Sequence, residues 1–247
     1  MAQQAPGDLE EPRPTPAWGS KAGRRPTPND ETIYREIYDA IVDHRLPPGT
    51  KLTEDALGEV FGVSRTRINK VLQRLAQEQI VALQRNRGAS VARPTVEEAR
   101  EVFAARRLIE AETVRLAAAH REPAALERLD DNLREEAEAL ANQDPRAMIE
   151  HSGRFHLTVA EMAGNRTLAR FLKALVARTS LIIAVYERPG GSPCDGDEHR
   201  MLRDLIAAGE ADAAATALIE HLSHIEAGLD FDQRAAKPTD LAQVFNR

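Results

Sequence analysis

The first apolar pattern in the chain has the period of an α-helix. Ile33, Ile37 and Ile41 recur every four residues and therefore share one face of a helix. Asn29 and Asp30 stand just before this pattern, and either of them can cap the helix, which is therefore predicted to begin there. The segment LPPGTKL follows and ends the helix, because proline cannot continue its hydrogen bonding.

Two further helices are predicted on either side of a glycine turn. Thr53 is placed to cap a short helix through Val60, and Gly62 closes it in a left-handed conformation. Ser64 can cap the helix that comes next. The buried face of that helix consists of Ile68, Val71, Leu72 and Leu75, which recur at i, i+3, i+4 and i+7. Two helices joined by so short a turn indicate a helix-turn-helix.

The pattern then changes to the alternation that is typical of strands. Val81 and Leu83 alternate with their neighbours, the residues RNRG supply a turn, and Ala89 and Val91 alternate again. This predicts a small β-hairpin directly after the helix-turn-helix, in the position of a wing.

The rest of the chain is predicted to be helical. Thr95 and Glu98 have the spacing of a capping box, which opens a helix that runs to about Ala119. Asp144 followed by Pro145 marks another helix start. Further helices are predicted at 122–142, 145–163, 166–187, 195–208 and 212–229. Since no segment here has convincing strand character, we expect an antiparallel helical bundle.

The predicted fold class is therefore mainly α, with an N-terminal winged helix-turn-helix and a C-terminal all-α antiparallel helical bundle. We expect the winged helix-turn-helix at 29–93 and the bundle at 94–232. Residues 1–28 hold six of the fourteen prolines and have no apolar periodicity, so they are predicted to be a disordered tail. Residues 233–247 form a predicted C-terminal tail.

The amino-acid composition indicates the structural class of the protein and its cellular compartment. The 247 residues are 42% hydrophobic but only 4% aromatic, a mixture that supports packed helices. Cys194 is the single cysteine, which excludes an intramolecular disulfide and fits a reducing compartment. No apolar run approaches the roughly eighteen residues of a membrane helix, and the N-terminus lacks the apolar core of a signal peptide. We therefore expect a cytoplasmic protein that is not a membrane protein.

Positive charge is concentrated near the predicted reading helix, although the chain as a whole has a formal net charge of -6. The stretch 63–93 contains seven Arg and Lys residues and only one acidic residue, Glu78. Residues 94–247, in contrast, carry nineteen Lys and Arg against twenty-seven Asp and Glu. This asymmetry favours nucleic-acid binding by the N-terminal module.

The start of the third helix has the chemistry of a DNA-reading surface. Its apolar face is turned inward, and the first residues of a helix in the major groove are the ones that reach base edges. Hydroxyl groups and free backbone N–H groups there suit phosphate oxygens. The predicted DNA contacts on this helix are Ser64, Arg65, Thr66, Arg67, Asn69 and Lys70, and those on the wing are Arg85, Asn86, Arg87 and Gly88. A merely solvated basic face is the alternative, but the combination of charge, helix-turn-helix and wing favours double-stranded DNA.

The segment LPPGTKLTEDALGEVFGVSRTRINKVLQRLAQEQIVALQRNRGASV resembles the winged helix-turn-helix of the GntR family of bacterial transcription regulators. The resemblance covers about sixty residues. It departs from the family at three positions: Asn69 stands where the family usually has Arg, Lys70 where it has Glu, and Arg67 at a small or proline position. The resemblance implies the same docking on operator DNA, with a shifted base preference.

Three histidines in the second module are candidate metal ligands. His156, His199 and His221 fall on separate predicted helices. Their spacing alone does not favour a metal site, because isolated histidines are commoner than ligand clusters. The sequence has no HExxH motif, and Cys194 is not part of a CxxC pair.

The segments FHLTVAEMAGN and EHRMLRDLIAAGEADAAATALIEHL resemble the FCD effector domain of GntR regulators. The resemblance implies that His156, His199 and His221 bind a divalent metal, zinc or nickel, or else line a metal-free polar pocket. The family's fourth ligand, an Asp or Asn, is replaced here by Ser152, which we assign to the effector site. His151 is expected at the surface, and His224 either near the metal site or at the surface.

Arg106 matches an arginine that often faces the effector pocket in the family. The alternative is an intrahelical ion pair with Glu110, four residues later.

These observations predict an effector-responsive, DNA-binding transcription regulator, most often a repressor in such families, for a catabolic operon. The expected partners are operator DNA, a small-molecule effector of carboxylate type, and a second copy of the chain in a homodimer. A metal-dependent enzyme with a DNA-binding appendage is the alternative. The sequence argues against it, because no carboxylate with general-base geometry is evident beside the histidines. A constitutive DNA-architectural protein is a third possibility.

Overall fold

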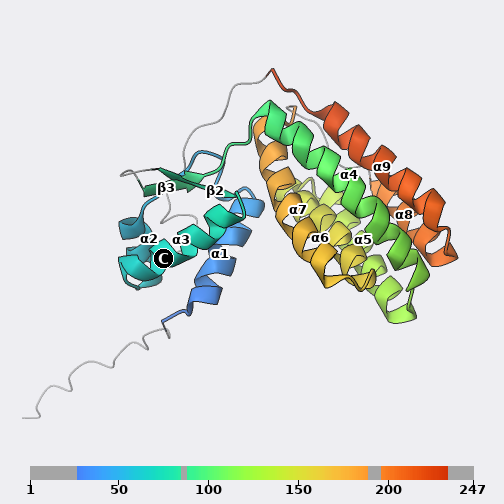
Figure 1. The fold of residues 1–247 in the computed structure, drawn as a ribbon, viewed down its shortest axis with the longest axis horizontal. Helices are drawn as coiled ribbons and strands as arrows, with labels where there is room; N and C mark the ends of the chain where they lie inside the picture. The colour runs from blue at the N-terminus through green and yellow to red at the C-terminus, as the bar shows by residue number, and fades with distance from the viewer. Residues whose placement is uncertain (1–26, 85–87, 189–195, 233–247) are drawn as a thin grey trace, which may run out of the picture.

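The computed structural model describes residues 27–84, 88–188 and 196–232. Its described part is mainly helical, with a small antiparallel sheet next to the N-terminal helices (Figure 1). The N-terminal elements are α1 (Asp30–Val42), β1 (Lys51–Leu52), α2 (Glu54–Phe61), α3 (Arg65–Gln77), β2 (Val81–Gln84) and β3 (Gly88–Val91). This arrangement is a winged helix-turn-helix, as the apolar pattern predicts.

The N-terminal helices begin at their predicted capping positions, whereas α1 ends at Val42, before the prolines that were expected to end it. The side chain of Asn29 accepts a hydrogen bond from the backbone N–H of Thr32, at 2.8 Å, and so caps α1. Thr53 caps α2 in the same way. Gly62 ends α2 with a φ of +65°, in the left-handed region where glycine carries no steric penalty. The tight turn into α3 therefore depends on this glycine.

The strand β1 was not predicted from the sequence. It has two residues, and it pairs with β3 through Leu52 and Ala89, so the strand order is β1-β3-β2. Two residues are too few to show an alternating pattern, and the preceding prolines read only as a break. The strand completes the sheet that covers α2 and α3.

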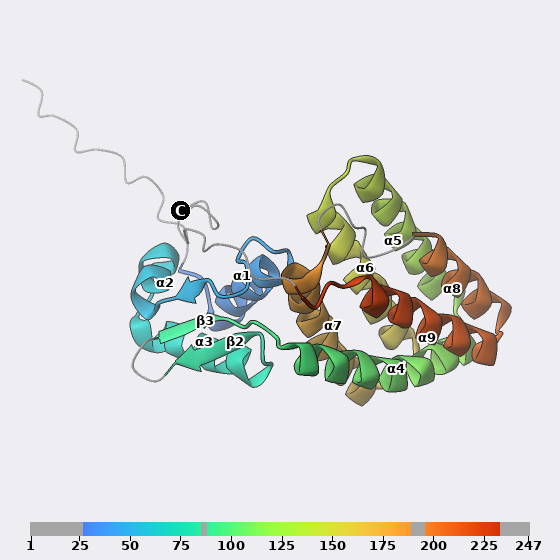
Figure 2. The same ribbon diagram turned by 90° about the horizontal axis from the view of Figure 1, so that it is seen from above.

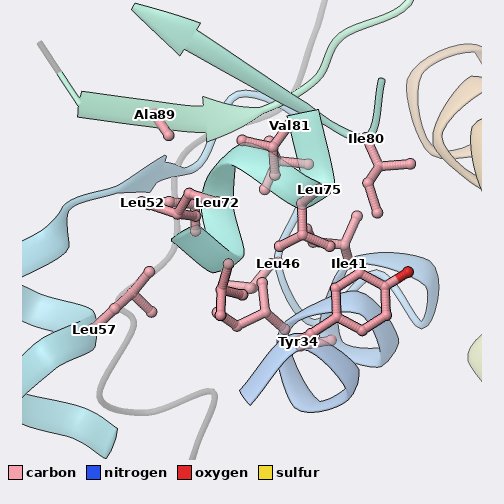
Figure 3. Packing of buried hydrophobic residues seen from close by; sticks show 14 of the residues in the cluster. Tyr34, Ile41, Leu46, Leu52, Leu57, Leu72, Leu75, Ile80, Val81 and Ala89 are labelled. Carbon is pink, nitrogen blue, oxygen red and sulfur yellow. The ribbon is translucent and has the colours of Figure 1, made fainter. Parts of the chain in front are cut away.

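The core of the N-terminal domain lies between α1, α3 and the sheet. Figure 3 shows Leu72 and Leu75 of α3 directed toward Leu52, Val81 and neighbouring apolar side chains. Two residues of the C-terminal bundle, Ala177 and Leu181, belong to the same cluster. The two domains therefore share buried apolar surface.

The second domain is a helical bundle, as predicted. Its helices are α4 (Val96–Ala119), α5 (Pro123–Ala141), α6 (Pro145–Met162), α7 (Arg166–Tyr186), α8 (Gly196–Ala208) and α9 (Ala211–Gly228). The capping box of Thr95 and Glu98 is present in full. The helix α4 is central, since it packs against α6, α7, α8 and α9 (Figure 1).

The helix α7 adjoins the N-terminal domain, where it packs against α1 (Figure 2). Among the described residues, every helix is too short or too polar to cross a membrane.

Candidate functional site

The start of α3 presents polar and basic side chains to solvent. Ser64, Arg65, Thr66 and Lys70 are exposed. Ser64 occupies the N-cap position of α3, but its side chain makes no capping hydrogen bond. The Ser64 hydroxyl and the first backbone N–H groups of α3 are therefore available to donate hydrogen bonds to phosphate oxygens. Arg65 forms an exposed ion pair with Asp55, which solvent screens.

Two of the predicted reading residues have partners inside the domain. Arg67 donates from Nε to Asp30 at 2.7 Å and from Nη2 to the Pro28 carbonyl at 2.7 Å. Asn69 donates to Glu54 at 2.5 Å and accepts from Gln73. Arg67 therefore ties α3 to the start of α1, and Asn69 ties it to α2. These bonds hold the start of α3 against α1 and α2.

The wing is described only at its base. Gly88 is exposed at the start of β3, and its φ of +79° explains why glycine follows the turn. Arg85, Asn86 and Arg87 lie outside the described residues.

Three histidines from three helices converge inside the bundle. His156 comes from α6, His199 from α8 and His221 from α9, and all three are buried. One ring nitrogen of each lies within 4.8 Å of one nitrogen of each of the others. The Nε2 atoms of His199 and His221 are 3.2 Å apart. We call these three residues the histidine cluster.

The Nδ1 atoms of His156 and His199 are each held by a carboxylate. Nδ1 of His156 is 2.6 Å from Oε2 of Glu110, and Nδ1 of His199 is 2.9 Å from both oxygens of Glu136. Each Nδ1 therefore carries the proton and donates it, which leaves the Nε2 lone pair free for another ligand. Among the described residues, Nε2 of His156 has no hydrogen-bond partner.

The third ring is held by a shared carboxylate. Nδ1 of His221 is 2.6 Å from Oε2 of Glu198, whose other oxygen is 2.6 Å from Nδ1 of the exposed His224. His224 is thus an outer partner of the cluster rather than a member of it. The bond to Glu198 raises the pKa of His224.

The protonation of the cluster suits metal binding. Burial lowers the pKa of His156 to about 4 and that of His221 well below its usual value, so both rings are neutral at pH 7. Burial raises the pKa of Glu110, but the positive charge of Arg106 and the hydrogen bond with His156 outweigh it and lower this pKa to about 2. Neutral imidazoles with carboxylate-bound Nδ1 atoms are the usual form of histidine ligands.

The spacing also fits a small divalent ion. Two nitrogens about 2.0–2.1 Å from a tetrahedral zinc ion lie roughly 3.3 Å apart, close to the 3.2 Å between His199 and His221. At this distance one nitrogen can donate a hydrogen bond to the other if it carries a proton; if neither does, a cation between them relieves the repulsion of the two lone pairs. The residues present therefore fit a metal ion.

A small cavity borders the histidine cluster. Its volume is about 30 Å³, and apolar residues of α1, α6, α7 and α9 form part of its lining. The polar residues that line it are Arg106, Ser152, His156, Thr179 and Ser180. The side chain of Arg106 is 3% exposed. Arg106 donates from Nε to Glu110 at 2.5 Å, whereas its Nη2 has no partner among the described residues. Arg106 therefore forms the intrahelical ion pair with Glu110 and also lines the cavity, while its role toward an effector stays a prediction.

The sequence reveals no carboxylate with general-base geometry beside the histidines, but three carboxylates do contact the rings. They belong to Glu110, Glu136 and Glu198, and each is directed at an Nδ1 atom. Glu198 could have been noticed from its position next to His199, but Glu136 has no local signal. His151, expected at the surface, is partly buried, with 16% of its side chain exposed.

Two family models match this chain. The family model "Bacterial regulatory proteins, gntR family" matches residues 29–91, and the model "FCD domain" matches residues 101–224. The first range contains the winged helix-turn-helix, and the second contains the histidine cluster and the residues that face the cavity from α4 and α6.

Named relatives and a solved structure are similar over most of the chain. The HTH-type transcriptional regulator LutR of Bacillus subtilis is 25% identical in an alignment 208 residues long, which covers 75% of this chain and 94% of the relative. The putative L-lactate dehydrogenase operon regulatory protein of Escherichia coli is 26% identical in an alignment 232 residues long, which covers 83% of this chain and 88% of the relative. The crystal structure of a putative GntR transcriptional regulator from Rhodococcus sp. RHA1 matches with a TM-score of 0.70 and 26% identity, and covers 80% of this chain and 95% of that one.

The family models, the named relatives and the solved structure all describe transcription regulators. The chain belongs to the GntR family of bacterial regulatory proteins, in the group that carries an FCD domain, and it is a DNA-binding, effector-responsive transcription regulator.

Proposed function

We propose that this regulator represses a catabolic operon and leaves its operator when a small carboxylate enters the cavity beside the histidine cluster. The observation that carries this proposal is the buried guanidinium of Arg106, which faces the cavity with Nη2 unpaired among the described residues. A buried cationic donor without a full set of partners is costly, and a carboxylate ligand supplies the missing acceptor.

The histidine cluster is the proposed site of a divalent metal, zinc or nickel. His156, His199 and His221 would hold it through their Nε2 atoms, while Glu110, Glu136 and Glu198 keep the rings oriented. A metal held there would supply positive charge beside the cavity, which would attract an anionic effector. Ser152 lies in the cavity one helical turn before His156. Its hydroxyl adds no charge, unlike the Asp that, as an alternative to Asn, the resemblance implies at this position in the family.

The chemistry of the cavity limits the effector. A volume of about 30 Å³ holds roughly one water molecule, so only a small ligand fits after modest side-chain movement. The relative from Escherichia coli is named for an L-lactate dehydrogenase operon. We therefore take L-lactate, a small 2-hydroxycarboxylate, as the first effector to test.

DNA binding is proposed to use a homodimer. A single α3 reads one short half-site, whereas two copies place their reading helices in successive major-groove faces about 34 Å apart. Ser64, Arg65, Thr66 and Lys70 are the proposed contacts from α3, with Arg67 and Asn69 as orienting residues that can exchange partners on DNA. The basic wing residues Arg85, Asn86 and Arg87, with Gly88, are proposed to contact the adjacent groove.

The test is a titration of a duplex, selected from a random library for tight binding, with the zinc-loaded protein at fixed salt. We expect L-lactate to weaken binding about tenfold, within the usual range of allosteric coupling. Arg106→Lys keeps the charge but removes the fork that binds carboxylates, and it should abolish this response without loss of DNA binding. An equal response to L-lactate in both proteins would exclude Arg106 as the effector ligand.

A further inference from the structure

The helix α7 forms a wall shared by the cavity and the DNA-binding domain. Val176, Thr179 and Ile183 line the cavity on one side of the helix. Ala177 and Leu181 are buried on another side, within the core of the winged helix-turn-helix. A movement of α7 away from a cavity ligand therefore displaces residues on which the DNA-binding domain is packed.

Ser180, on α7, contacts both the cavity and the DNA-binding domain. It lines the cavity, and its hydroxyl donates a hydrogen bond of 2.6 Å to the carbonyl oxygen of Val42, the last residue of α1. That carbonyl is one of the four at a helix end that have no partner within the helix. Val42 lines the same cavity.

His44 forms a second contact between the DNA-binding domain and Ser180. Its Nε2 lies 2.8 Å from the carbonyl oxygen of Ser180 and 3.0 Å from the hydroxyl oxygen. Because Ser180 uses its only hydroxyl proton on Val42, the imidazole must be the donor in both contacts. The φ of His44 is +57°, a conformation that residues with side chains adopt only when surrounding contacts hold them there. We call Val42, His44 and Ser180 the clasp.

We propose that the clasp couples the cavity to the DNA-binding domain, and that Ser180 is the residue through which an effector acts on it. Ser180 has one hydroxyl proton, and an anionic effector in the cavity competes with the Val42 carbonyl for it. When Ser180 donates its hydroxyl proton to the effector, the hydrogen bond to the Val42 carbonyl is lost. The end of α1 is then no longer bonded to the Ser180 hydroxyl on α7, and the DNA-binding domain is released from its present orientation. This inference rests on the proposed function for the direction of the response.

The test is a double-mutant cycle that needs no effector. In the structure, a Cβ added at Gly153 would meet Val176 Cγ1 at 3.2 Å, so a larger side chain there fills the cavity and presses on α7. Gly153→Leu should push α7 and so break the bond from Ser180 to the Val42 carbonyl, which we expect to lower operator affinity about tenfold in the native background. Ser180→Ala has already lost that bond and its affinity, so Gly153→Leu should lower affinity less than twofold further in that background. If the two substitutions act independently, with equal fold-changes in both backgrounds, the clasp is not the coupling element.

Two further variants separate coupling from loss of structure. Ser180→Thr keeps the hydroxyl and should restore the response to Gly153→Leu. Ser223→Ala removes a similar side-chain bond, from Ser223 to the Ile219 carbonyl on α9, and should leave the response unchanged. If Gly153→Leu does not fold by melting analysis, Gly153→Ala makes the same push with one methyl group and favours the helix.

A second arm, with L-lactate as the probe, distinguishes this inference from the proposed function. If L-lactate releases native protein but not Ser180→Ala, both stand. If L-lactate releases both proteins from the operator equally, the clasp is not the coupling element, and the assignment of L-lactate as effector stands. If it releases neither, while the mutant cycle still shows dependence on Ser180, the clasp stands and the choice of effector is wrong.

Discussion

At the scale of single residues, the site depends on carboxylates that hold histidine rings. Glu136 is 5% exposed and lies within 2.9 Å of Nδ1 of His199 with both oxygens. It fixes which nitrogen carries the proton and raises the basicity of the nitrogen that faces the cluster. The histidines could be proposed from sequence because they stand in short motifs. Glu136 could not, because an acidic residue on α5 has the local pattern of a solvent-exposed one.

This role predicts that Glu136→Gln lowers the affinity for zinc about 10–100-fold, the usual effect of losing such a partner. The amide is the same size, so the bundle should remain folded. The adjacent Glu135 pairs with Arg154 at the surface, and Glu135→Gln is the matched control. Competition with a chromophoric chelator measures both affinities. Equal zinc affinity in the two variants would mean that Glu136 does not support the metal.

At the scale of elements, helix boundaries follow from local sequence, but side-chain assignments on those helices do not. The capping residues and apolar spacing of α3 predict its extent, since these are interactions within about four residues. Arg67, in contrast, bonds to Asp30, thirty-seven positions earlier, and only the packed fold brings them together. The two-residue strand β1 was missed for a related reason, because its partner β3 lies far along the chain.

The element α3 gives a prediction about DNA. Arg65 is exposed at the start of the helix, so Arg65→Ala should weaken binding to the selected duplex by about 1–3 kcal/mol through loss of a base contact. Arg74, near the other end, bonds to Glu31 and lies 3.6 Å above the Tyr34 ring. Arg74→Ala removes the same charge from the same helix and should change affinity far less. Fluorescence anisotropy at fixed salt compares them, and equal losses would refute direct reading by Arg65.

At the scale of the whole molecule, the helix α7 contributes residues both to the lining of the cavity and to the core of the N-terminal domain. The fold class and the order of the domains could be predicted from apolar periodicity and charge. The clasp could not, because it combines an α1 carbonyl, a left-handed histidine and a serine 136 positions later. The histidine cluster likewise joins α6, α8 and α9, so a metal there connects helices that are separate in sequence.

The claim on which this account most depends is that the histidine cluster binds one metal ion per chain. The most direct test is elemental analysis of protein purified without a histidine tag or chelator. We expect close to one equivalent of zinc or nickel in the native protein, and a strong loss of metal in His221→Ala. His151→Ala should retain it, because that ring points to Glu135 instead. Native protein that contains no stoichiometric metal, and gains no thermal stability from added zinc or nickel, would contradict the account.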